Sequence, residues 1–177
     1  MVKEEKKGEL NVDNISLVLN SYNDIFSSFD PRVYSEKALS DDFLIECEKA
    51  AVDKEEDFEL RLLIPRHKRN INDEIKIKKR LKSHFQKHFD KESKKVKAIR
   101  REGLIWFFVG AIVMVAATFL YNQEGFWFNL LFIMAEPASW FMFWEGLYKV
   151  FIEYKANLDD YEFYKKMNKA QIYFLNY

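Results

Sequence analysis

The chain has 177 residues, enough for one compact unit, and its 28 basic and 28 acidic residues leave no net charge. The charge is divided along the chain: residues 1–65 hold 16 acidic against 8 basic side chains, residues 66–102 hold 15 basic against 5 acidic, and residues 104–121 hold none. A soluble core does not require this division, whereas a membrane boundary does. The single cysteine, Cys47, excludes an internal disulfide and fits a reducing cytoplasmic compartment.

Two apolar segments predict a pair of membrane-spanning helices. Leu104–Tyr121 is an uninterrupted apolar run of 18 residues, which covers about 27 Å as a helix. A second run, from Phe126 to about Phe151, follows after residues 122–125, which suffice only for a tight antiparallel turn. One such segment alone would also fit the buried core helix of a soluble protein, but two in succession favour a transmembrane hairpin. The first 20 residues have no apolar run typical of a signal peptide, so the first span is expected to direct its own insertion.

The residues that flank these spans predict their orientation. Five basic residues precede the first span and are the predicted contacts for anionic lipid headgroups: Lys94, Lys95, Lys97, Arg100 and Arg101. Lys149 and Lys155 follow the second span, while the turn has no basic residue, so the positive-inside rule predicts that both termini are cytoplasmic. Trp106, Trp127 and Trp144 are the predicted interfacial aromatic residues. We therefore expect a multi-pass protein of the cell membrane (inner or plasma membrane).

The N-terminal segments predict a small folded region outside the bilayer. Residues 14–29 carry apolar side chains at helical spacing, so an amphipathic helix is expected there. Ser40 offers an N-cap for a second helix that runs to about Val52. Residues 57–64 alternate between apolar and polar side chains, which predicts a strand.

The later segments are expected to complete this region. A long basic helix is predicted from about Asn72, and nothing before Tyr121 forces it to break, so it is expected to continue into the first span. Residues 171–176 form a second strand-like run, which should pair with residues 57–64 because a lone strand leaves its backbone groups unsatisfied. The predicted fold is a two-helix transmembrane hairpin plus a small cytoplasmic α+β domain closed by the N-terminal and C-terminal segments. The expected divisions are 1–102, the hairpin 103–152, and a C-terminal helix and strand at 153–177.

The order of these features resembles a family of small, uncharacterised bacterial and archaeal two-span membrane proteins. The shared features are Asp30-Pro31, the segment Ser35–Asp42, one strand, a basic helix, and a hairpin whose second span carries Trp and Glu from Glu136 to Glu145. Such proteins have a glycine before the tryptophan where this chain has Ser139, which makes close packing at that point less certain. The family has no assigned activity, so the resemblance implies an architecture only.

Glu136 is the most informative single residue of the sequence. It lies about ten residues into the second span, near the expected bilayer midplane, and Pro137 follows it. A carboxyl group at that depth costs about 2–3 kcal/mol, so it should face protein or water and not lipid. Pro137 should also kink the helix and leave the carbonyl of Ile133 without its donor. Two interpretations stay open: a polar residue that fixes helix packing, or part of an ion or proton path.

The other polar candidates have simpler interpretations. Glu145 is expected near the cytoplasmic interface, paired with Lys149 at i+4. His84 and His88 have the i, i+4 spacing of a zinc site, but no third ligand is evident, and a solvated basic face explains them better. The basic run beside a span favours lipid headgroups over nucleic acid as its partner. No glycine-rich phosphate loop is present, and the sequence predicts no catalytic residue, no cofactor and no metal.

These observations predict a non-enzymatic membrane protein and leave two functional hypotheses. The first is a homo-oligomeric interaction, sensing or scaffold protein, because a two-helix hairpin is too small to enclose anything alone. The alternative is an oligomeric ion channel with Glu136 in or near its conduction path.

Overall fold

The computed structural model describes residues 14–54, 58–121 and 123–177. The chain forms two compact units. We call the first the sheet unit; it consists of the described residues up to Phe89 together with Glu162–Tyr177. The second, the hairpin unit, is Asp90–Tyr161. The two units are described separately.

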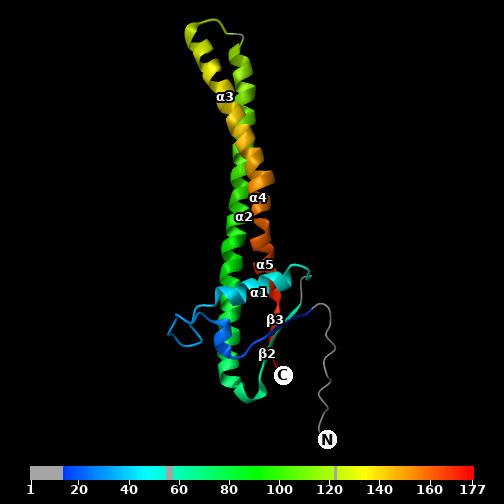
Figure 1. Cartoon of the computed structure of the whole chain (residues 1–177). Coiled ribbons are helices and arrows are strands. Elements are labelled where there is room, and N and C mark those ends of the chain that lie inside the picture. The colour runs from blue at the N-terminus through cyan, green and yellow to red at the C-terminus, as the bar shows by residue number, and fades with distance from the viewer. Residues whose placement is uncertain (1–13, 55–57, 122) are drawn as a thin grey trace. The chain divides into compact units, whose positions relative to one another are not determined.

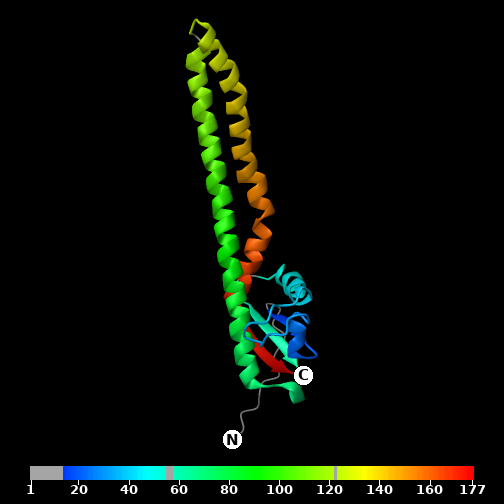
Figure 2. The ribbon, with the colours of Figure 1, turned by 90° about the vertical axis from the view of Figure 1, so that its left-hand side faces the viewer.

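The sheet unit is built on three parallel strands in the order β1-β2-β3. These are β1 (Ile15–Val18), β2 (Glu59–Ile64) and β3 (Gln171–Asn176). In the central strand, Leu60 is in register with Ile15 on one side and with Ile172 on the other. The predicted pairing of the C-terminal strand with the strand at 59–64 is therefore confirmed, and Figure 2 shows the strands side by side.

Helices cover one face of this sheet. Both crossovers move across the sheet in the same direction, so right-handed connections place α1 (Asp41–Ala51), the start of α2 (Ile71–Tyr121) and α5 (Leu158–Lys169) on a common face. On that face Leu60, Leu62 and Ile64 are fully buried, with 0% of their surface exposed. The intervening residues of β2 are only half-buried. The core therefore lies between one face of the sheet and the helices.

The helix predicted at residues 14–29 is wrong. The segment forms β1, followed by the short 3-10 helix η1 (Tyr22–Ile25). The carboxylate of Asp24 accepts the backbone N–H of Asn20 at 2.6 Å and that of Ser21 at 3.2 Å, which favours a turn where the helix was expected. The apolar spacing fitted a helix, but strand pairing with β2 overrides it, and Phe29 is left 95% exposed.

The other predicted elements of the sheet unit are confirmed. Helix α1 begins after Ser40 and α2 runs without interruption to Tyr121, as the sequence indicated. Ile77, Leu81 and Phe85 form the buried face of α2, while Ile75 is 62% exposed. A second short 3-10 helix, η2 (Arg66–Lys68), precedes α2.

The Asp-Pro motif organises the loop before α1. The carboxylate of Asp30 accepts the backbone N–H of Ala38 at 2.7 Å and pairs with the Arg32 guanidinium at 2.7 Å. These hydrogen bonds, led by the one from Arg32, hold the pKa of Asp30 well below its usual value. Asp30 is thus ionised across the neutral range and fixes both ends of the loop.

A buried polar network joins η1 to the start of α2. The phenol of Tyr22 donates to the carboxylate of Glu74 at 2.8 Å and accepts the backbone N–H of Asn70 at 2.9 Å. Two guanidinium nitrogens of Arg69 also bind Glu74, each at 2.8 Å, and Arg69 reaches Asn176 in β3 at 2.7 Å. Burial raises the pKa of Tyr22 to about 12, so its hydroxyl remains a donor at physiological pH.

The hairpin unit consists almost entirely of helices. It contains the second part of α2, then α3 (Phe126–Tyr148), a π-helical turn η3 (Lys149–Glu153), α4 (Tyr154–Ala156) and the first residues of α5. The long helix α2 and the helical segment Phe126–Ala156 are each long and apolar enough to span a membrane. Figure 1 shows α2 and α3 running side by side from the turn at residues 123–125.

We expect Tyr22→Phe to destabilise the sheet unit by about 1–3 kcal/mol, because the substitution leaves the Asn70 N–H without its acceptor and removes one of the two hydrogen bonds that Oε1 of Glu74 accepts. Thermal and denaturant unfolding of the full-length protein in detergent would measure this loss. Tyr34→Phe is the matched control, since its hydroxyl makes only an exposed contact of 3.3 Å with Asn23. Equal unfolding midpoints for Tyr22→Phe and the parent would contradict the role assigned to this network.

Candidate functional site

Small residues form the contact between α2 and α3. Gly103, Gly110 and Ala117 recur every seven residues along α2, and Ser139 and Gly146 have the same spacing in α3. A Cβ atom at Gly110 would lie 2.6 Å from the backbone nitrogen of Phe143, and one at Gly103 would lie 3.1 Å from the carbonyl oxygen of Gly146. The two backbones therefore approach so closely that larger side chains do not fit, as in small-residue contacts between membrane helices.

Ser139 belongs to this contact. It is 1% exposed, and its hydroxyl donates to the backbone carbonyl of Glu136 at 2.7 Å. A serine can therefore replace the expected glycine, because its hydroxyl is satisfied within its own helix. Helix packing at this point is close, which answers the question left open by the sequence.

Glu136 lies outside the contact between the two helices. Its side chain is exposed, and among the described residues it makes no side-chain hydrogen bond or ion pair. Exposed residues recur every three or four positions around it and share one helical face; we call this set the Glu136 face, and it comprises Asn129, Ile133, Glu136, Trp140 and Trp144. Glu136 therefore does not hold the hairpin together within one chain. Its polar group is left uncovered by α2.

Pro137 lies inside α3, which continues through it from Phe126 to Tyr148. A proline has no N–H to donate to Ile133, so that carbonyl loses its helical donor. The Ser139 hydroxyl donates to a different carbonyl, that of Glu136, and so does not replace the donor that Pro137 removes. The carboxyl group of Glu136, the proline and this side-chain hydrogen bond therefore lie within one turn of α3.

Glu145 pairs with Lys149, as predicted. The ammonium group of Lys149 lies 3.9 Å from the Glu145 carboxylate, 3.8 Å from Glu102 in α2 and 3.3 Å from Glu153. Lys149 is the first residue of the π-helical turn η3, and π-helical turns occur frequently at functional sites. Three acidic side chains therefore surround one lysine, which ties α2 to the end of α3.

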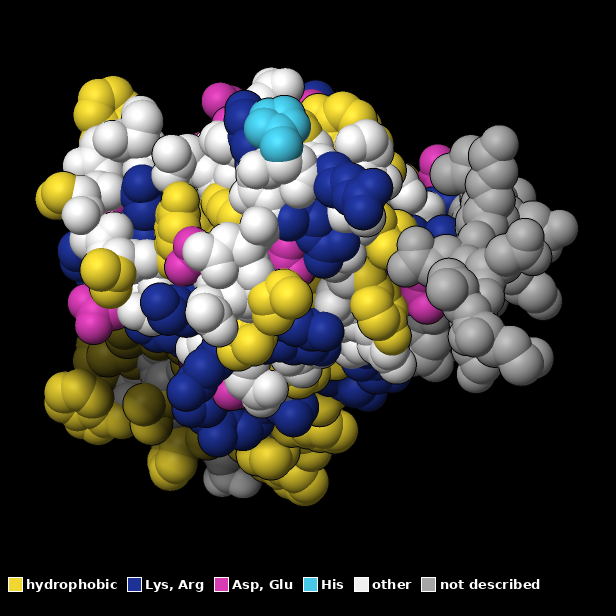
Figure 3. Space-filling view, turned by 90° about the horizontal axis from the view of Figure 1, so that it is seen from below, with side chains coloured by type: hydrophobic (Ala, Val, Ile, Leu, Met, Phe, Trp, Pro, Cys, Tyr) yellow, Lys and Arg dark blue, Asp and Glu magenta, His cyan; other side chains and the backbone are white. Residues whose placement is uncertain are grey.

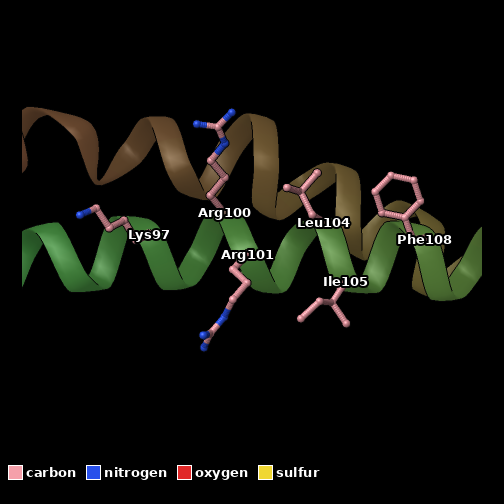
Figure 4. Close-up of a pocket in the computed structure, with 6 residues that line it drawn as sticks. All are labelled: Lys97, Arg100, Arg101, Leu104, Ile105 and Phe108. Atoms are coloured by element: carbon pink, nitrogen blue, oxygen red, sulfur yellow. The ribbon is translucent and has the colours of Figure 1, made fainter.

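The predicted lipid-contacting residues divide into paired and unpaired cations. Lys95 lies 3.6 Å from the buried carboxylate of Glu92. Lys94, Lys97, Arg100 and Arg101 are exposed, and none of them has an ion pair or hydrogen bond within the described part of the chain. The last three line an open groove of about 320 Å³ together with Leu104, Ile105 and Phe108. We call this the basic-apolar groove; Figure 4 shows its lining residues along α2.

The predicted interfacial tryptophans are all exposed. Trp106 is 37%, Trp127 is 72% and Trp144 is 54% exposed. Trp127 is the second residue of α3, while Trp106 and Trp144 lie close to the level of Gly103 and Gly146. Their exposure leaves them accessible, and their place at a membrane interface stays a prediction.

The histidines of α2 form an aromatic stack. The rings of His84 and His88 lie 4.2 Å apart, and that of His88 lies 4.9 Å from Tyr164 of α5. Burial, and to a lesser extent the positive charge of His88, Arg80 and Lys87, lower the pKa of His84 to about 4. In the described ranges, no group of three or more His, Cys, Asp or Glu side chains is placed to hold a metal ion.

A polar hollow of about 330 Å³ lies in the sheet unit. Arg32, Tyr34, Lys37, Asp73 and Lys76 are among its lining side chains. Two of its cations are neutralised, since Arg32 binds Asp30 and Lys76 lies 3.7 Å from Asp73. Figure 3 shows that Lys and Arg side chains also gather elsewhere on the surface, beside hydrophobic ones. Positive charge beside apolar side chains is therefore not particular to the basic-apolar groove, and an occupant can be inferred there only from the pairing of its cations and the order of its lining residues along α2.

The sequence singled out Ser139 as a packing position, but Gly103 and Gly146 were not predicted. Their spacing of seven residues, from Gly110 and from Ser139 respectively, is the signal that could have identified them. Asn129 lies seven residues before Glu136, a spacing that predicts a shared face. The ion pair between Lys149 and Glu102 could not be predicted from the sequence, because the two residues are 47 positions apart.

Comparison of the chain with protein-family models, with curated proteins and with solved structures gives no match. The resemblance to a family of two-span membrane proteins therefore stays a prediction.

The packing of α2 on α3 can be tested with two adjacent alanines. Ala117 is 5% exposed within the contact, whereas Ala116 is exposed beside it. We expect Ala117→Leu to force the helices apart and to destabilise the protein by about 1–3 kcal/mol, as overpacking does, while Ala116→Leu should be nearly neutral. Thermal unfolding in detergent measures both. Equal effects of the two substitutions would show that the contact is not tight.

Proposed function

We propose that the chain is an integral membrane protein that crosses the cell membrane twice with both termini in the cytoplasm. It assembles into a homo-oligomer and presents its sheet unit as a cytoplasmic interaction or sensing module; it is not an enzyme. The observation that carries the proposal is the exposed carboxyl group of Glu136 in the middle of a helix long enough to span a membrane.

The argument is energetic. Glu136 lies ten residues after Phe126, about 15 Å along α3 and near the middle of a 30 Å hydrocarbon layer. A carboxyl group that faces lipid at that depth costs about 2–3 kcal/mol, and α2 does not cover it. A second copy of the chain offers a matching polar group, because Asn129 and Glu136 share one face in every copy. Trp140 adds a large side chain of the kind that stabilises interfaces.

The alternative is an oligomeric channel. The same exposed face supports it, because Asn129 and Glu136 would line a water-filled path if three or more copies turned this face inward. The two proposals share the interface and differ in whether water fills it.

Topology gives the first test. We expect a membrane-impermeant maleimide to label Gln123→Cys from outside intact cells and to leave a cysteine added at either terminus unlabelled. The parent should show almost no background, because Cys47 is 0% exposed and burial raises the pKa of its thiol to about 12. Labelling of a terminal cysteine from outside would reject the proposed orientation.

Association gives the second test. In bilayers, Glu136→Leu should raise the dissociation constant between copies about fivefold, the effect of losing one intramembrane hydrogen bond of about 1 kcal/mol. Glu136→Gln keeps the hydrogen-bonding capacity and should associate like the parent. Met134→Leu is the control, since Met134 is 66% exposed but lies on another face. Single-molecule photobleaching counts the copies, and a parent that is monomeric at all densities would reject the oligomer.

An ion-flux assay on the same proteins separates the two functions. If Glu136 lines a conduction path, Glu136→Gln should lower cation flux at unchanged copy number, because it removes the charge that attracts the ion. The scaffold proposal expects no flux from a fully assembled parent.

A further inference from the structure

The basic-apolar groove is chemically complementary to both ends of an anionic phospholipid, the charged headgroup and the apolar acyl chain. Three cations and three apolar side chains line it over the twelve residues from Lys97 to Phe108. In Figure 4, Lys97, Arg100, Leu104 and Phe108 rise along one edge, while Arg101 and Ile105 point to the opposite edge. The cations come first along α2 and the apolar side chains follow, so the polarity of the groove changes once, along its length.

The cations of the groove are uncompensated. Among the described residues, Lys97, Arg100 and Arg101 have no acidic partner, although acidic side chains neutralise the nearby Lys95 and Lys149. The apolar floor is also uncovered: Leu104 is 41%, Ile105 is 54% and Phe108 is 58% exposed. An occupant must therefore supply negative charge at one end and an apolar chain at the other.

We propose that this groove binds one anionic phospholipid as a site-bound ligand. Its phosphate lies between Arg100, Arg101 and Lys97, because a guanidinium group donates two parallel hydrogen bonds to phosphate oxygens and a lysine adds a point charge. One acyl chain lies along Leu104, Ile105 and Phe108. The proposal depends on the membrane location of α2, but not on the homo-oligomer.

Charge complementarity and position select this occupant over a nucleic acid. A nucleic acid would engage the cations alone and leave the exposed apolar floor in water. The groove begins directly before the uncharged run of α2, where the headgroup layer of a bilayer would lie. A phospholipid satisfies both ends of the groove at once.

The test compares two triple variants of the full-length protein that change the charge equally. The first replaces the groove cations (Lys97→Gln, Arg100→Gln, Arg101→Gln). The second replaces three exposed lysines elsewhere (Lys79→Gln, Lys87→Gln, Lys155→Gln). Native mass spectrometry of each protein, titrated with phosphatidylglycerol or phosphatidylcholine in detergent, gives the affinity for each lipid.

We expect the parent and the second variant to retain one phosphatidylglycerol and to prefer it over phosphatidylcholine. Each basic group near a lipid phosphate contributes about a fivefold preference, so the groove variant should lose on the order of 100-fold in affinity for phosphatidylglycerol. A further variant, Arg100→Lys with Arg101→Lys, keeps the charge but loses the paired donors, and should bind with intermediate affinity.

Three outcomes would overturn the proposal. Equal losses in both triple variants would mean that net charge alone attracts the lipid. Full retention by the groove variant would place the lipid elsewhere. Displacement of phosphatidylglycerol by a short DNA duplex, with loss of duplex binding in the groove variant, would assign the cations to a nucleic acid. Equal melting temperatures and elution volumes would establish that every variant is folded. Labelling of Gln123→Cys from outside intact cells tests the membrane location separately, so a failure of the lipid site can be distinguished from a failure of the membrane location.

Discussion

The close contact between α2 and α3 is the constraint on which the rest of the hairpin unit depends. Gly110 and Gly146 allow backbone atoms of one helix to touch the other, and the seven-residue spacing repeats that contact along both helices. Such spacing keeps one narrow face of each helix toward its partner, as in left-handed pairs. Two helices that touch along narrow faces leave most of their circumference uncovered. The exposed Glu136 face and the basic-apolar groove are both consequences of that geometry.

Some charged side chains of this protein are held in ion pairs that stabilise the fold, and others have no partner among the described residues and could bind a ligand. Lys149 has three acidic neighbours, Glu74 has a bidentate arginine, and Asp30 holds Arg32. Each of these groups fixes an element boundary or a loop. Charges without such partners are the informative ones, because an exposed cation beside an exposed apolar surface has not been used by the fold. The same reasoning applies to Glu136, whose carboxyl group has no partner among the described residues.

Much of the fold was predictable because the strongest sequence signals are local. The uncharged run, the short turn, the strand at 59–64 and the uninterrupted helix from residue 71 all follow from patterns within one element. The strand β1 was not predictable in this way, because its four residues also fit a helical stripe and only pairing with β2 decides between them. Within the candidate site, the sequence predicted Glu136 near the middle of a span but could not establish that α2 leaves its side chain exposed. The exposure of Glu136 depends on which face of α3 packs on α2. The position of Gly146 against Gly103 identifies that face, and this pairing requires the structure.

Helix α2 uses two different packing rules along one uninterrupted backbone. In the sheet unit it buries large side chains four residues apart, Ile77, Leu81 and Phe85, against the sheet. In the hairpin unit it still buries Val96 and Ile99, but from residue 103 onward its buried positions are Gly103, Gly110 and Ala117, seven residues apart. In water, burial of apolar area is favourable, so large apolar side chains stabilise a helix that packs there. In lipid this hydrophobic driving force is absent, and helices associate by close van der Waals contact between small residues. The change from large to small contact residues falls in the same stretch of α2 as the change from basic to uncharged sequence. If the hairpin unit spans a membrane as proposed, packing and charge both put the expected boundary near residue 103.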